Sequence, residues 1–238
     1  MTSTQILVSI IAALLVLSVA AFVIRRRRQV GPRIGPYSEI RAELLAQYEN
    51  YPEPAVLTER PAGIDTRLSL DDGHAFEEQF RLHKQEPGSE NEFFDRYIDI
   101  LRSISEELQA ISTEYDALDL LSEPRRAVFV VDALYANVNN GGFDQYYINS
   151  SGNGAAMAPA CFRRMGLADI AEIVERANSV FADSPSMLRQ RRMKQIESLG
   201  EQSSALWEAC DTDFFQRESD VLSNSAEYIL HNRNEFFR

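Results

Sequence analysis

A run of nineteen residues without a charged side chain, from Ile6 to Ile24, restricts the folding of this chain more than any other feature. As an α-helix it spans about 28 Å, close to the hydrocarbon thickness of a bilayer. Four basic residues follow it directly: Arg25, Arg26, Arg27 and Arg28. Residues 1–5 carry no basic side chain, so the charge order is the reverse of that in a secretory signal peptide. The positive-inside rule therefore predicts an uncleaved single-pass anchor in the inner (cytoplasmic) membrane, with the N-terminus outside and the rest of the chain in the cytoplasm. The alternative is a buried core helix, although this length favours the anchor.

Composition excludes several classes of protein. Two cysteines, Cys161 and Cys210, are too few for a disulfide scaffold or a Cys-rich zinc module, and they suit a reducing cytoplasm. The three histidines form no metal-binding motif. A net charge of −12 argues against direct binding of nucleic-acid phosphates.

The acidic residues are distributed unevenly along the chain. Residues 1–36 hold five arginines and no acid, so the remainder carries a net charge of −17. Most of that charge lies in residues 37–135, at −13, and residues 136–238 carry −4. Solubility and repulsion from an anionic membrane leaflet explain such a bias in the simplest way. The alternative is a more specific, functional interpretation, in which the acidic residues form a face that binds a basic partner.

The region between the predicted anchor and residue 92 contains few regular patterns. Two Gly-Pro dipeptides mark residues 29–36 as a linker, and Ser38 caps a predicted helix through about Glu49. We interpret residues 29–91 as a linker and acidic arm, extended over the surface or partly disordered, with a short helix over residues 72–84. Its Asp71, Asp72 and His74 are interpreted as a solvated N-cap cluster rather than a metal site.

Residues 92–238 are predicted to form one compact all-α domain, so that the chain divides at residues 28 and 91. Apolar residues recur at spacings of three and four, and neither an internal repeat nor a β-hairpin signal is present. Ser122 and Pro124 mark a helix start, and Ser184-Pro185 marks another. The predicted helices cover residues 92–112, 122–138, 143–149, 155–165, 169–181, 184–199, 203–215 and 226–237.

The most distinctive segment extends from Tyr135 to Gly152 and contains the sequence NNGGFDQYYINSSG. Two adjacent glycines predict a tight turn between helices, with amide side chains capping free backbone groups and aromatic rings packing inward. An anion-binding nest at the start of the following helix is the alternative. Amides do not titrate, so no catalytic residue is assigned. The candidate binding residues of this motif are Asn139, Asn140, Gly141, Gly142, Phe143, Gln145 and Asn149.

This segment resembles the signature of a bacterial DNA-mimic protein family, a helical domain of largely unknown function. Further marks are Met165-Gly166, Asp211-x-Asp213-Phe214-Phe215, and Tyr228-Ile229 before Phe236-Phe237. The resemblance covers roughly residues 92–238. It implies an all-helical fold and, from the best-described member, an acidic homodimer that binds a transcription factor in place of DNA.

Together these features predict a membrane-anchored, non-enzymatic protein whose acidic surface binds a basic or nucleic-acid-binding protein. The alternative is a small-ligand-binding or hydrolytic domain that uses the Asn-Asn-Gly-Gly turn as a polar pocket. Neither a cofactor nor a metal is expected. A basic cluster near Arg192 is interpreted as a solvated helix face, with pairing to a second chain or membrane contact as alternatives. The acidic candidates for partner binding are Glu106, Glu107, Glu114, Asp116 and Asp119, and four more lie on the arm: Asp71, Asp72, Glu77 and Glu78.

Overall fold

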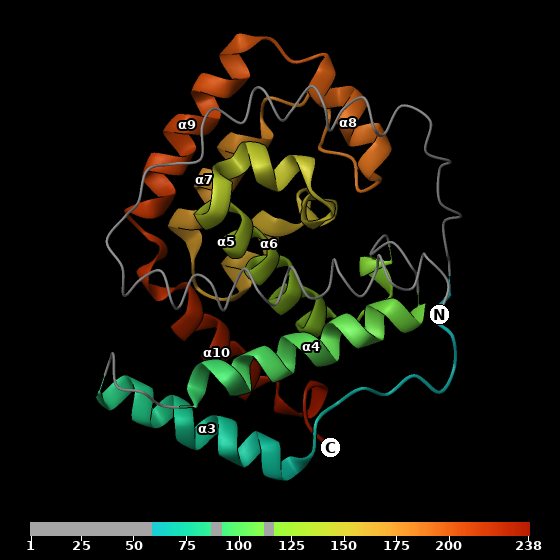
Figure 1. The fold of residues 1–238 in the computed structure, drawn as a ribbon, viewed down its shortest axis with the longest axis vertical. Helices are drawn as coiled ribbons and strands as arrows, with labels where there is room; N and C mark the ends of the chain where they lie inside the picture. Colours follow the sequence, from blue (N-terminus) through green and yellow to red (C-terminus); the bar gives the residue numbers. More distant parts are fainter. Residues whose placement is uncertain (1–58, 87–91, 112–116) are drawn as a thin grey trace.

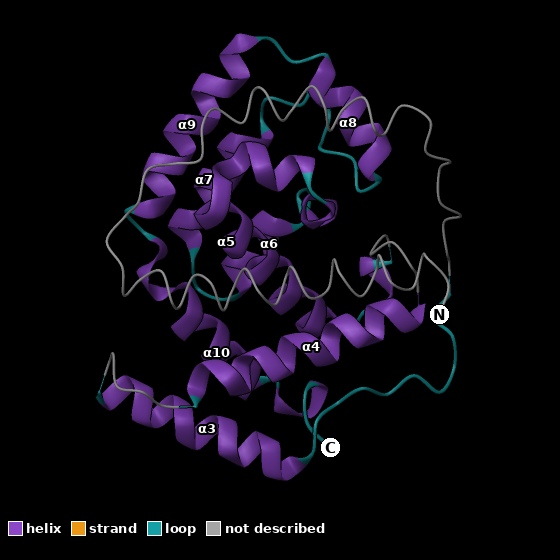
Figure 2. Ribbon diagram, in the orientation of Figure 1, coloured by secondary structure: helices purple, strands orange, loops and turns teal. Residues whose placement is uncertain are grey.

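The computed structural model describes residues 59–86, 92–111 and 117–238, and within them it contains helices but no strand (Figure 2). The predicted all-α class is therefore confirmed for this part of the chain. The α-helices are α3 (Leu70–Gln85), α4 (Phe93–Ile111), α5 (Glu123–Ile148), α6 (Ala158–Arg164), α7 (Ala168–Asn178), α8 (Arg189–Glu197), α9 (Glu201–Phe215) and α10 (Val221–His231). Short 3-10 helices cover Leu118–Leu120, Ser150–Gly154, Glu218–Asp220 and Arg233–Glu235.

The predicted anchor over residues 6–24, its arginines and the predicted helix over residues 38–49 lie outside the described residues. Among the helices that the structure does describe, none has the length and apolar character needed to cross a membrane. The anchor therefore stays a prediction from the sequence.

Helix α5 lies at the centre of the molecule and contacts α4, α6, α8, α9 and α10 (Figure 1). It begins after Ser122 with Pro124 in its first turn, as predicted, because proline there removes only an N–H that has no partner within the helix. The run from Ala127 to Val131 suits a strand in composition, yet it is helical and mostly buried. Tertiary packing on several sides of the helix overrides the weak strand preference of its β-branched residues.

Helices α3 and α4 lie side by side at one end of the molecule (Figure 1). Ser69 caps α3, and its hydroxyl accepts from the backbone N–H of Asp72 while the Asp72 carboxylate accepts from the N–H of Ser69. The predicted N-cap cluster is thus present. Phe76 and Phe80 are buried against the Phe93 ring of α4, so that α3, which the sequence places in the arm, packs into the core.

The C-terminal segment closes this end of the core. Leu68 forms an isolated parallel β-bridge with Phe237, and the N–H of Arg238 donates to the carbonyl oxygen of Leu68 at 2.8 Å. The chain around residue 68 is therefore held against the last residues of the domain, far away in sequence.

The start of α8 differs from the prediction. Ser184-Pro185 does not open this helix, which begins at Arg189. The segment before it is held in place by α8 itself. The Arg192 guanidinium donates to the carbonyl oxygen of Ser186 at 2.6 Å, and the Gln195 amide nitrogen donates to the carbonyl oxygen of Ser184 at 2.8 Å. These side-chain contacts replace the helical hydrogen bonds that the proline signal predicts.

Candidate functional site

The Asn-Asn-Gly-Gly motif forms a sharp kink inside α5. Gly141 has φ −159° and ψ 19°, and Gly142 has φ 79° and ψ −176°. The backbone is helical on both sides, so the motif joins two helical parts as predicted. Only Gly142 occupies the region that favours glycine, since a φ near −159° is open to any residue.

Asp211 of α9 caps the second helical part. Its Oδ1 accepts a hydrogen bond of 2.8 Å from the backbone N–H of Phe143. A carboxylate is favourable at a helix N-terminus because the free N–H groups and the helix dipole both attract negative charge. The anion position that the sequence suggested at this turn is therefore occupied by a side chain of the protein itself.

The amide side chains of the motif are used within the fold. Asn139 donates to the carbonyl oxygen of Tyr135 at 2.9 Å and to the Glu218 carboxylate at 2.5 Å. Asn149 donates to Oδ1 of Asn137 at 2.8 Å. Gln145 is buried, whereas Asn140 is exposed. This arrangement agrees with the predicted capping role and gives no converging set of free polar groups.

The aromatic rings of the motif pack inward, as predicted. Phe143, Tyr146 and Tyr147 are fully buried, and the Tyr147 ring stacks on Trp207 with 4.9 Å between ring centroids. The Tyr147 hydroxyl donates to Oδ1 of Asn178 at 2.7 Å. Burial raises the pKa of Tyr146 and Tyr147 above the usual value, so both hydroxyl groups stay protonated near neutral pH.

Arg192 is fully buried at the C-terminal end of α5, and the sequence analysis did not single it out as a core residue. Its guanidinium donates to the carbonyl oxygens of Tyr147 at 2.7 Å and Asn149 at 2.8 Å, and to Oδ1 of Asn153 at 3.0 Å. Burial lowers its pKa to about 9. The interpretation as a solvated basic face is therefore wrong for Arg192.

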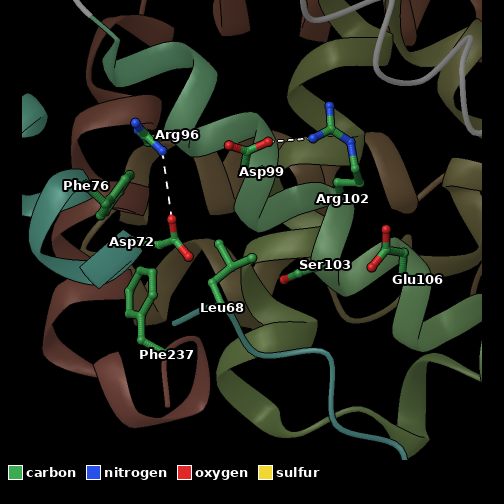
Figure 3. A pocket seen from close by; sticks show the side chains of 9 residues that line it. All are labelled: Leu68, Asp72, Phe76, Arg96, Asp99, Arg102, Ser103, Glu106 and Phe237. Carbon is green, nitrogen blue, oxygen red and sulfur yellow. Dashed lines mark hydrogen bonds and ion pairs between the residues drawn. The ribbon is translucent and has the colours of Figure 1, made fainter. Parts of the chain in front are cut away.

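The motif lines neither of two cavities in the described part of the chain. One cavity, of about 120 Å³, lies between α3, α4 and the C-terminal segment (Figure 3). The other is a shallow depression over α6, α7 and the segment after α7. The geometry thus supports a structural junction rather than a polar pocket at the Asn-Asn-Gly-Gly turn.

Comparison with known proteins finds a family model that matches part of this domain. Residues 119–232 match the family model described as DMP19-like protein. This part of the chain is therefore DMP19-like. This confirms the resemblance to a DNA-mimic family drawn from the sequence motif. No curated protein and no solved structure matches the chain.

The matched DMP19-like region begins after α4, so four of the five acidic candidates Glu106, Glu107, Glu114, Asp116 and Asp119 precede it. Glu106 on α4 is exposed, and Asp119, in the 3-10 helix at the start of the match, is exposed as well. Glu114 and Asp116 lie outside the described residues. Glu107, the neighbour of Glu106, is only 2% exposed.

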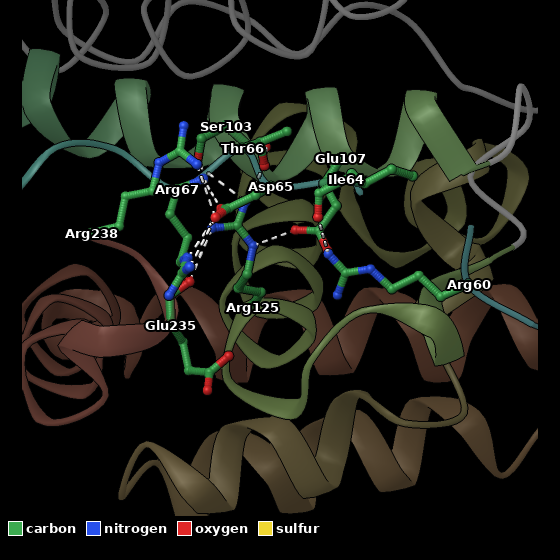
Figure 4. A network of polar contacts seen from close by, with 10 residues as sticks. All are labelled: Arg60, Ile64, Asp65, Thr66, Arg67, Ser103, Glu107, Arg125, Glu235 and Arg238. Atoms are coloured by element: carbon green, nitrogen blue, oxygen red, sulfur yellow. Dashed lines mark hydrogen bonds and ion pairs between the residues drawn. The ribbon is translucent and has the colours of Figure 1, made fainter. Parts of the chain in front are cut away.

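Glu107 is therefore wrongly placed among the surface acids by the sequence analysis. Its Oε2 lies 2.6 Å from Nε of Arg125, a buried residue of α5, and its Oε1 lies 2.6 Å from the Arg60 guanidinium (Figure 4). Arg125 also donates to the Thr66 hydroxyl at 2.8 Å. This network ties the segment before α3 to α4 and, through Arg125, to α5 inside the DMP19-like region.

Several carboxylates remain on the outer surface of α3 and α4. Asp95, Asp99 and Glu106 are four and seven residues apart, so they share one face of α4. Asp99 is paired with Arg102 at 2.5 Å. Asp71, Asp95 and Glu106 are exposed, and in the described part of the chain no ion pair is shown for them. We call these three residues the free acidic set.

The described residues offer neither a cluster of metal ligands nor an exposed cysteine thiol. No group of three or more His, Cys, Asp or Glu side chains there could hold a metal ion. Cys161 and Cys210 are buried, and burial raises the pKa of the Cys161 thiol to about 11. Cys210 accepts from Nε of Arg176 at 3.4 Å, yet burial outweighs this contact and raises its pKa too.

Proposed function

We propose that this protein is a non-enzymatic binding protein whose acidic surface takes the place of DNA for a basic, nucleic-acid-binding protein. The observation that carries the proposal is the match of residues 119–232 to a DNA-mimic family, together with the free acidic set on α3 and α4. A protein that binds DNA phosphates with lysine and arginine presents the charge that such a surface attracts.

The electrostatics of the chain support this assignment. The residues after the predicted linker carry a net charge of −17, and most of that charge precedes residue 136. Many surface arginines are already paired, such as Arg163 with Glu175 at 2.6 Å and Arg81 with Glu78 at 2.6 Å. The excess negative charge is therefore available to a partner rather than to the protein's own cations.

The alternative of a ligand pocket at the Asn-Asn-Gly-Gly turn has no support from the geometry. Asp211 occupies the N-terminus of the following helical part, and neither cavity includes the motif. We therefore do not propose a hydrolytic or small-ligand function for this motif.

We further propose that residues 6–24 anchor the protein in the cytoplasmic membrane, with the helical domain in the cytoplasm. The support is the uncharged run and the four arginines after it. In intact cells and in spheroplasts the domain should resist external protease until the membrane is permeabilised. Digestion from outside, or a mature protein that begins after residue 24, would contradict this topology. The homodimer implied by the resemblance also stays a prediction, which sedimentation of the detergent-solubilised chain tests.

Affinity capture tests the binding function. The full-length chain, solubilised in a non-ionic detergent, is used to capture proteins from a cell extract at about 0.1 M and about 0.5 M salt, because exposed charges are strongly screened at the higher concentration. The test variant carries Asp71→Asn, Asp95→Asn and Glu106→Gln. The control variant carries the same loss of charge on other exposed acids: Asp183→Asn, Glu197→Gln and Glu208→Gln.

We expect a basic protein that is captured at low salt, lost at high salt, and lost in the test variant but not in the control variant. Capture that is equal in both variants and insensitive to salt would contradict an electrostatic binding surface on α3 and α4. Circular dichroism on each variant shows that the helical fold is retained.

A further inference from the structure

A buried carboxyl group lies where the DMP19-like region contacts α4. Asp132 of α5 is 7% exposed, and its Oδ1 is shielded from solvent and has no hydrogen-bond partner. We propose that Asp132 is a pH-sensitive latch, which holds α4, and the α3 packed on it, against α5 while its carboxyl group carries a proton. The inference rests on the proposed function in that it assigns a regulation to these two helices, which carry the free acidic set.

Three helices meet at this carboxyl group. Tyr97 of α4 lies near Asp132, whose charge contributes to the raised pKa of the Tyr97 phenol. The Tyr97 hydroxyl is hydrogen-bonded to the side chain of Ser225 on α10, and the Ser225 hydroxyl donates to Sδ of Met165 at 3.4 Å. Tyr97 and Ser225 are fully buried. The water that would solvate an ionised carboxylate is therefore largely excluded.

No cation compensates the charge of this carboxyl group in the part of the chain that the structure describes. The titratable side chains around it are two phenols, Tyr97 of α4 and Tyr135 one turn further along α5. Burial alone raises its pKa, to about 7, and no arginine, lysine or histidine of α4, α6, α8, α9 or α10 lowers it. The group therefore either keeps its proton or gains water through an opening of the structure.

Helix α4 is attached to α5 at two separate points. Near its C-terminal end, Glu107 pairs with Arg125 at 2.6 Å. Near its N-terminal end, Tyr97 packs beside Asp132, ten residues earlier and about 15 Å away along the helix. Ionisation of Asp132 weakens only this second attachment. Helix α3 follows the same half of α4, because Phe76 packs on Phe93 with 5.9 Å between ring centroids.

The direction of the switch follows from proton binding. The closed state keeps the proton of Asp132 up to about pH 7, whereas an open, hydrated carboxyl group releases it near pH 4. Rising pH therefore favours the open state, in which the N-terminal half of α4 separates from α5. The free acidic set is then no longer held in one fixed arrangement.

Hydrogen exchange of the full-length chain in detergent, followed by mass spectrometry at pH 6 and pH 8, tests the latch. Protection factors correct for the faster intrinsic exchange at the higher pH. We expect the protection factor of residues 93–104 to be about tenfold lower at pH 8, because the closed carboxyl group ionises between these two values and the open one is ionised at both. Residues 143–148 of α5 should keep a higher protection factor at both pH values, since they exchange only when the whole domain unfolds.

Two variants assign the effect to Asp132. Asp132→Asn keeps the shape of the side chain without its charge, so residues 93–104 should have the same protection factor at pH 6 and pH 8. Asp95→Asn is the matched control, because it removes a charge from an exposed position on the same half of α4 and should keep the tenfold difference. Circular dichroism shows whether each variant retains the helical fold.

Three results would overturn the latch. The first is a protection factor of residues 93–104 that does not change with pH in the natural chain. The second is a change that persists in Asp132→Asn, which would assign it to another group, such as His83, whose ring stacks on Phe93 at 4.7 Å. The third is equal protection of residues 93–104 and 143–148, which would mean that the helices open only together.

Hydrogen exchange requires no partner, so its outcome separates this inference from the proposed function. Exchange that does not respond to pH, combined with protein capture that the test variant loses, leaves the acidic surface in place and removes only the latch. A tenfold response without any salt-dependent capture leaves the latch in place and removes the proposed function.

Discussion

Gly142 is the residue whose backbone the kink in α5 requires. Its φ of 79° lies in the left-handed region, and a β-carbon there would clash with the Asp211 carboxylate that caps the next helical part. Gly142→Ala should therefore lower the free energy of unfolding by about 1–3 kcal/mol, through backbone strain and the displaced cap.

Gly200→Ala provides the matched control, because a β-carbon at Gly200 meets no atom within 4 Å and its φ is −79°. Thermal unfolding of the two variants is the measurement. An unchanged midpoint for Gly142→Ala would show that the turn does not depend on this glycine.

Asp132 is a buried carboxyl group on α5, and its Oδ1 has no hydrogen-bond partner. Burial raises its pKa to about 7, and its charge contributes to the raised pKa of Tyr97 on α4, although burial of that phenol contributes most. The folded protein thus keeps a proton on Asp132 that the unfolded chain releases near pH 4.

This difference makes stability fall as pH rises through the window between about 4 and 7, because the folded state binds more protons there. Asp132→Asn should remove this loss of stability. The free energy of unfolding of the variant should therefore rise relative to that of the natural protein by up to about 1.4 kcal/mol per pH unit in that window. Acids with lowered pKa values, such as Glu78 and Glu175, act in the opposite direction but cancel in the comparison. Urea unfolding at pH 4.5, 6 and 7.5 measures the free energy of unfolding of both proteins. If it changes with pH equally in the two, the raised pKa of Asp132 is refuted.

Among the helices, the contact between α4 and α5 depends on the ion pair of Glu107 and Arg125. Both side chains are at most 3% exposed, and burial lowers the pKa of Arg125 although Glu107 opposes this effect. Glu107→Gln leaves a buried guanidinium without its carboxylate and should lower stability by about 3–5 kcal/mol.

The adjacent Glu106→Gln variant is the control, since it removes the same charge from an exposed position on the same helix and should change stability by less than about 0.5 kcal/mol. Chemical denaturation of both variants measures these two changes in the free energy of unfolding. Equal effects would mean that Glu107 is not the buried partner of Arg125.

Local patterns predicted most helices, and contacts between distant segments explain the rest. The stripe through Ile104, Leu108 and Ile111 predicts α4 because each apolar residue lies one turn from the next. Glu107 occupies the same stripe, three residues after Ile104, and this position was a signal for burial. Its partner Arg125 is eighteen residues away, and spacing along one helix does not identify such a partner.

The Asn-Asn-Gly-Gly turn also has one part that local sequence predicts and one part that depends on distant contacts. Adjacent glycines predicted the kink because few other residues accept a positive φ. The cap from Asp211 comes from a helix 68 residues further along the chain, so it depends on the tertiary fold. Arg192 was missed for the same reason, because the carbonyl oxygens that it contacts belong to distant turns.

The molecule as a whole combines a DMP19-like region with an N-terminal part that lies outside the family match. Helices α3 and α4 precede residue 119, yet they pack into the same core and carry the free acidic set. On this account the surface that binds a basic partner is supplied largely by the part of the chain before the family match.

Competition with DNA tests this account most directly. The protein captured by the full-length chain is bound to a fluorescently labelled DNA duplex at about 0.1 M salt, and the detergent-solubilised chain is then added while anisotropy is recorded. We expect DNA to be released at nearly equimolar amounts of the natural chain and of the Asp183→Asn, Glu197→Gln, Glu208→Gln control. The Asp71→Asn, Asp95→Asn, Glu106→Gln variant should release little. DNA that stays bound in the presence of excess natural chain, or release that is equal for all three proteins, would contradict the claim that the acidic surface of α3 and α4 replaces DNA.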